Sequence, residues 1–182
     1  MAGEAINRGS PLLWIVLLSA ASVLTSWALA CATPFAALAA LAALHMERRE
    51  GLILMAVAWL ASQAVGFGIH HYPRDPTTLM WGGVIGLAAI ASLLAARSAT
   101  SRAAGGAVMS LGAAFVGAVL GYKSVIIAGA LGLGGLTIAL SPTYFAQEFA
   151  RDGAIMIALL VLYRGLTAIG VPSAARRELI AI

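Results

Sequence analysis

One face of a predicted membrane helix carries side chains that could bind a ligand. Trp59, Gln63, Gly66 and His70 are spaced four, three and four residues apart, a spacing that puts them on one side of an α-helix. A glutamine amide inside a membrane must find a partner in protein, water or ligand. This stripe therefore predicts either a hydrogen bond to a neighbouring helix or one wall of a solute site.

A cysteine and two histidines could bind a transition metal. Cys31 is the only cysteine of the chain, and His70 and His71 stand together just before Tyr72 and Pro73. Thiolate and imidazole ligands together suit transition metals, so Cys31 and His70 are candidate ligands to a metal held within a larger ligand. The alternative is that Cys31 is a small buried apolar residue and that both histidines are solvated at the membrane surface.

Aromatic residues on the same predicted side of the membrane complete this candidate site. Trp81 and Tyr144 offer apolar surface with one polar group each, a usual combination in small-molecule sites. The predicted substrate-binding residues are Cys31, Gln63, His70, His71, Trp81 and Tyr144.

Composition identifies the class of protein that must position these side chains. Of the 182 residues, 62% are hydrophobic and 10% are charged, whereas a soluble domain carries about 25% charged residues. Apolar stretches of a length that crosses a bilayer recur along the chain. We therefore predict an all-α, polytopic membrane bundle that forms one integral domain over 1–182. The lysines and arginines occur singly or in pairs at segment ends, which favours a role in membrane orientation rather than nucleic-acid binding.

The distribution of positive charge decides how many segments cross. When 34–46 crosses and 124–140 does not, seven arginines face one side and three cations face the other, with Arg164 left inside the last helix. Cytoplasmic loops are rich in Lys and Arg, so the seven mark the cytoplasmic side. They are Arg8, Arg48, Arg49, Arg97, Arg102, Arg176 and Arg177, and the other three are Arg74, Lys123 and Arg151.

This arrangement predicts six helices with both termini in the cytoplasm. Their expected ranges are 12–30, 34–49, 51–70, 77–97, 104–121 and 153–171. The segment 122–152 is expected on the outer side, as a glycine-rich re-entrant piece over 124–140 followed by a surface helix that starts at Ser141 and Pro142. The Thr33-Pro34 pair predicts the start of the second helix and leaves Cys31 at the outer rim.

Six short helices, cytoplasmic termini and ligand groups in the outer loops resemble an S-component, the substrate-binding membrane subunit of energy-coupling factor vitamin transporters. Among these, the small solitary cobalamin-uptake relatives are the most similar. The resemblance implies a bacterial inner-membrane protein and an energy-coupling subunit as partner. It also implies cobalamin as substrate, with its cobalt bound by Cys31 or His70. In those relatives the cysteine belongs to a later loop.

The predicted function is thus membrane uptake of a vitamin-like solute bound at the outer face, with cobalamin favoured. The alternative is a non-transporting accessory or assembly subunit of a membrane complex. No P-loop, nucleophile-elbow or His-Glu-x-x-His motif occurs, so an enzyme is not expected. A thiol enzyme that uses Cys31 is the remaining catalytic hypothesis.

Overall fold

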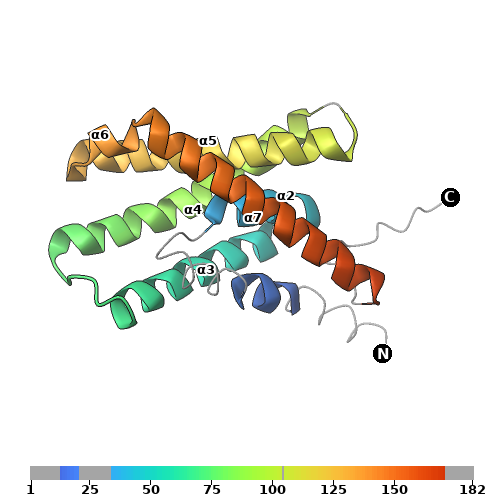
Figure 1. The fold of residues 1–182 in the computed structure, drawn as a ribbon, viewed down its shortest axis with the longest axis horizontal. Coiled ribbons are helices and arrows are strands. Elements are labelled where there is room, and N and C mark those ends of the chain that lie inside the picture. The colour runs from blue at the N-terminus through green and yellow to red at the C-terminus, as the bar shows by residue number, and fades with distance from the viewer. Residues whose placement is uncertain (1–12, 21–33, 104, 171–182) are drawn as a thin grey trace.

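A computed structural model describes residues 13–20, 34–103 and 105–170, and these ranges contain helices and turns without a β-strand (Figure 1). Residues 13–20 are helical. The helices that follow are α2 (Phe35–His45), α3 (Arg48–Gly68), α4 (Pro76–Arg102), α5 (Ala107–Leu133), α6 (Leu136–Ala139) and α7 (Pro142–Ala168). Cys31 and most of the predicted first helix lie beyond these ranges.

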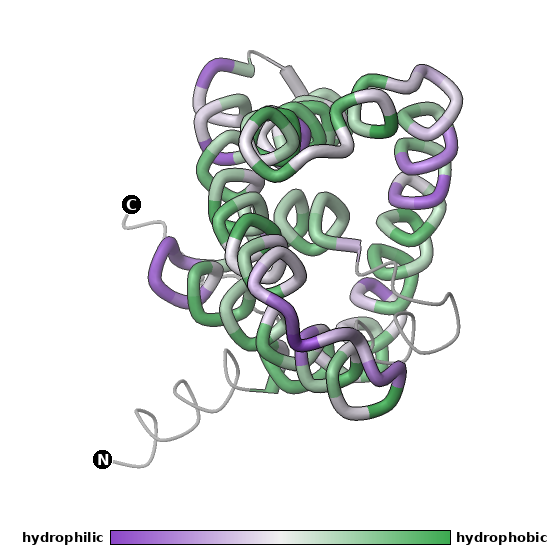
Figure 2. The backbone as a smooth tube through the Cα atoms, turned by 90° about the vertical axis from the view of Figure 1, so that its left-hand side faces the viewer, coloured by the Kyte–Doolittle hydropathy of each residue, from purple (hydrophilic) through white to green (hydrophobic). Residues whose placement is uncertain are grey.

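Three of the described helices, α3, α4 and α5, are long and apolar enough to cross a membrane. Figure 2 shows these helices mostly in the green of hydrophobic residues, while the chain between α3 and α4 is one of the purple, hydrophilic stretches. Exposed leucine, isoleucine, valine and methionine side chains occur along all three. The prediction of a helical membrane protein is confirmed at this level.

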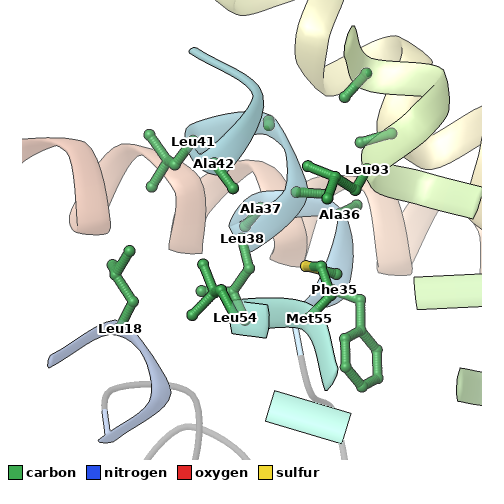
Figure 3. Packing of buried hydrophobic residues seen from close by; sticks show 14 of the residues in the cluster. Leu18, Phe35, Ala36, Ala37, Leu38, Leu41, Ala42, Leu54, Met55 and Leu93 are labelled. Atoms are coloured by element: carbon green, nitrogen blue, oxygen red, sulfur yellow. The ribbon is translucent and has the colours of Figure 1, made fainter. Parts of the chain in front are cut away.

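Helix α2 forms the centre of the core. It contacts α3, α4, α5 and α7, and its residues from Phe35 to Ala42 are all buried. Leu38 points toward Leu54 of α3, and Ala36 lies beside Leu93 of α4 (Figure 3). A helix that is apolar all round lies in a protein core or in a membrane, and the neighbours of α2 enclose it in the core of this bundle.

The boundary between α2 and α3 lies earlier than the sequence indicated. The predicted helix over 34–49 ends at His45, and Arg48 and Arg49 belong to the first turn of α3. Glu47 and Glu50 form a capping box, in which the Glu47 amide donates to Oε2 of Glu50 over 3.0 Å. This reciprocal cap satisfies amides that a new helix leaves without partners, so the chain starts α3 at this point.

Helices α4 and α5 pack antiparallel along a seam of small residues. A Cβ placed on Gly121 would lie 2.6 Å from Cβ of Ala95 and 2.7 Å from the Ala91 carbonyl oxygen, and Gly129 similarly faces Val84. The predicted end of this helix at 121 and the separate re-entrant piece over 124–140 are therefore corrected, because α5 continues unbroken to Leu133. Gly121 and Gly129 permit close helix packing and do not interrupt the helix.

The chain leaves α5 through two consecutive glycines. Gly134 and Gly135 have φ angles of 88° and 90°, which only glycine adopts at little cost, and the four-residue α6 follows. Helix α7 starts at Pro142 after Ser141, as predicted, but it continues to Ala168. The surface helix and the last predicted helix are thus one element, in which Gly153 lies against the Phe115 ring.

Asp75 caps the first turn of α4. Its carboxylate accepts hydrogen bonds from the Thr78 amide at 3.0 Å and from the Thr78 hydroxyl at 2.7 Å. These bonds, the amide bond first, lower the pKa of the Asp75 carboxyl below its ordinary value of 3.8. A helix N-cap satisfies an amide that has no partner within the helix.

We expect this cap to weaken in acid. A carboxyl whose pKa is lowered by folding contributes stability above its ordinary pKa and loses that contribution as the pH falls through the folded value. Protection of the Thr78 amide against hydrogen exchange should therefore be constant above about pH 5 and fall below about pH 4. In Asp75→Ala the amide should exchange fast at every pH. If the protection of the Thr78 amide in the wild type did not change with pH, this capping role would be contradicted.

Candidate functional site

A cleft of about 450 Å³ lies where α4, α5, α6 and α7 meet. We call it the α5–α7 cleft. Its volume falls within the usual range for small-molecule sites, about 300–1,000 Å³. The lining residues are Trp81, Lys123, Ile126, Leu133, Gly134, Gly135, Ile138, Ala139, Tyr144 and Glu148.

An ion pair forms the polar part of this cleft. Nζ of Lys123 on α5 lies 2.7 Å from Oε2 of Glu148 on α7. The Lys123 side chain is only 12% exposed, whereas that of Glu148 is 45% exposed. Nζ also lies 5.8 Å from the centre of the Phe145 ring, within the range of a cation–π contact.

Two aromatic side chains line the same cleft. Trp81 is partly buried, and Tyr144 is exposed over 53% of its surface. A Cβ on Gly135 would lie 4.0 Å from the Trp81 indole, so the glycine turn and the indole lie close together. The cleft thus combines apolar and aromatic surface with one cation and one anion.

Helix periodicity explains how α7 and α5 present these groups. Tyr144 and Glu148 are four residues apart, which places them on the same face of α7. Phe145 and Phe149 form the adjoining pair, with ring centres 6.2 Å apart, and Phe149 packs at 5.0 Å on Phe115 of α5. These aromatic contacts hold α7 against α5 in the orientation in which Glu148 faces Lys123.

Trp59 and Gln63 of the predicted stripe on α3 contact α4 and do not line the cleft. Nε1 of Trp59 donates to the Gly82 carbonyl at 2.8 Å. A Cβ placed on Gly82 would lie 2.7 Å from Oε1 of Gln63. Nε2 of Gln63 donates to the Ser62 hydroxyl at 3.3 Å. In the structure Gln63 is therefore a contact between helices.

The two histidines lie at the turn between α3 and α4. The His70 ring stacks on Tyr72 with centres 6.1 Å apart, and its Nε2 is buried without a hydrogen-bond partner among the described residues. His71 is exposed and has φ 52°, a left-handed conformation that turns the chain. Within the described ranges no three His, Cys, Asp or Glu side chains form a group that could hold a metal.

Of the six predicted site residues, the structure brings Trp81 and Tyr144 together in one cleft. Gln63, His70 and His71 lie elsewhere, and Cys31 is not among the residues described. Sequence reasoning missed Lys123 and Glu148 as a pair, because it ended the fifth helix before Lys123. Within a helix that runs to Leu133, a single lysine among apolar residues would have indicated the need for a partner.

Comparisons of the chain with protein-family models, with curated proteins and with solved structures found no match.

Proposed function

We propose that this chain is a bacterial inner-membrane protein that binds a small, vitamin-like solute in the α5–α7 cleft as a step in its uptake. The observation that supports this function best is the cleft itself, whose lining includes a charged pair and two aromatic side chains. Small-molecule sites are typically concave and mostly apolar, with a few polar groups that orient the ligand. The cleft has this composition.

We further propose six crossings, in which 12–30, α2 and α7 join the three long apolar helices and both termini are cytoplasmic. The α3–α4 turn and α6 lie toward the same end of the bundle (Figure 1), and we assign this end to the outer side. At the opposite end, Nη2 of Arg97 donates to the Met46 carbonyl near the start of α3. The arginines at this end of the bundle support its assignment to the cytoplasmic side.

Cobalamin remains the first solute to test, through Cys31 or His70 as a cobalt ligand. The ten residues around the α5–α7 cleft include neither histidine nor cysteine, so a cobalt contact would require a separate site. A smaller solute with charged and apolar parts fits the cleft better. An energy-coupling subunit would supply the driving force for uptake.

The test is binding of a panel of vitamins, amino acids and cobalamin to the purified protein, followed by thermal unfolding. We expect at least one small solute to raise the unfolding temperature, and Tyr144→Ala to weaken its binding about tenfold, which corresponds to about 1.4 kcal/mol. The matched control is Val161→Ala, an exposed position on the same helix, which should bind as the wild type does.

Cobalamin has its own readout in this panel. A stoichiometric shift of its absorption spectrum that Cys31→Ala abolishes would establish a cobalt–thiolate contact. Binding of a small solute without that shift would restrict the function to the cleft. If no solute binds, the uptake proposal fails, and an accessory subunit of a membrane complex becomes the better hypothesis.

A further inference from the structure

The two partners of the ion pair in the α5–α7 cleft differ in how far their side chains are buried. Lys123 is residue 17 of the 27 in α5, about 15 Å before its C-terminal end at 1.5 Å per residue. Its side chain is almost fully enclosed, whereas nearly half of the Glu148 side chain is exposed. The cation is therefore the fixed partner, and the carboxylate is the one that can move away.

The surroundings of Lys123 favour retention of a negative partner. Burial without a partner is costly for a charged group, because water no longer solvates it. Nζ has the Glu148 carboxylate and the Phe145 ring near it. A second carboxylate that entered the cleft could replace that of Glu148, which is the less enclosed partner of the pair.

The remaining lining restricts what such a carboxylate can carry. Ile126, Leu133 and Ile138 offer apolar surface, and Trp81 and Tyr144 offer aromatic surface. Rings prefer offset-stacked or edge-to-face contacts with aromatic side chains. The cleft thus suits a carboxylate attached to a ring or a short apolar body.

We infer that the solute of this cleft is a small aromatic or apolar carboxylate, which pairs with Lys123 by displacing Glu148. The inference rests on the proposed function and names the chemical class of its solute. Glu148 then acts as an internal competitor that holds Lys123 while the cleft contains no solute. Its exchange requires no change in the helices, because both carboxylates use the same Nζ.

The experiment uses 4-fluorobenzoate as the probe, with 4-fluorobenzamide and 4-fluorobenzylamine as its neutral and cationic analogues. Binding to the full chain in micelles is measured by ¹⁹F NMR line broadening, with empty micelles subtracted. In the wild type we expect the benzoate to bind at least tenfold more tightly than either analogue. This comparison needs no variant, so it does not depend on the folding of any substitution.

The variant Glu148→Gln removes the competing charge and keeps the shape of the side chain. We expect it to bind 4-fluorobenzoate about tenfold more tightly than the wild type. Glu50→Gln is the matched control, since it makes the same substitution and the same change in net charge at the start of α3, where a glutamine can keep the capping bond to the Glu47 amide. It should leave the affinity unchanged.

Equal affinity for the benzoate and the benzamide, or no gain in Glu148→Gln, would overturn the inference. These results differ from a failure of the proposed function. If neutral solutes bind in a manner that Tyr144→Ala weakens, the cleft is a solute site and only the carboxylate class is wrong. If neither the probes nor the solute panel binds, both proposals fail.

Discussion

Replacing Gly121 with alanine should destabilise the folded protein by about 2–3 kcal/mol, the usual size of an overpacking penalty. The added Cβ would lie 2.6 Å from Cβ of Ala95 and 2.7 Å from the Ala91 carbonyl oxygen. The carbonyl belongs to the backbone of α4, so no side-chain rotation relieves the contact. Helices α4 and α5 would have to separate, and this would loosen the contact that each makes with α2. Reversible unfolding in mixed micelles, followed by circular dichroism, measures the change.

The matched control is Gly112→Ala on the same helix. A Cβ at Gly112 would meet no atom within 4 Å, and alanine favours a helix over glycine by about 1 kcal/mol. We therefore expect Gly112→Ala to be neutral or stabilising. Equal effects of the two substitutions would show that the seam does not depend on close approach at Gly121.

The glycines of α5 also show what could be predicted from the sequence. Apolar content was sufficient for the membrane class, and the Ser141–Pro142 pair was sufficient for the start of α7. The role of each glycine could not be predicted from the sequence, because glycine permits close packing at Gly121 and turns the chain at Gly134. Only the presence or absence of a neighbouring helix distinguishes the two.

The prediction of the candidate site depended on which role the glycines near Lys123 were given. With the helix ended at 121, Lys123 became a loop residue that only oriented the protein in its membrane. The continuous helix makes Lys123 an enclosed cation that requires a partner, and Glu148 provides it. Trp81 and Tyr144 were predicted from residue type and expected side of the membrane, and both line the cleft. Gln63 fitted the same criteria, but it lies against Gly82 of α4, which agrees with the alternative interpretation of this residue as a contact with a neighbouring helix.

Arg97 of α4 contacts the C-terminal end of α2 through two backbone carbonyls. Its Nη2 donates to the Met46 carbonyl at 2.6 Å and lies 3.4 Å from the Ala42 carbonyl at the end of α2. The last carbonyls of a helix have no partner within the helix, and a cation near this end is favoured by the helix dipole. The guanidinium of α4 thus satisfies the end of α2 at the point where the chain turns into α3.

Arg97→Met should therefore destabilise the protein by about 2 kcal/mol, in the range measured for hydrogen bonds to charged groups. The stability of Arg97→Lys should lie between that of the wild type and that of Arg97→Met, because lysine keeps the charge but lacks the planar guanidinium with its several donors.

Arg102 is the matched control on the same helix. It donates within the last turns of α4, to the Ser98 carbonyl and hydroxyl. Arg102→Met should accordingly change stability by less than about 0.5 kcal/mol. Hydrogen exchange should locate the Arg97→Met effect at the α2–α3 turn, because the Met46 carbonyl loses its donor there and the Ala42 carbonyl keeps only the Met46 amide. A uniform loss across all helices, or equal effects at both arginines, would instead assign Arg97 a role in charge distribution alone.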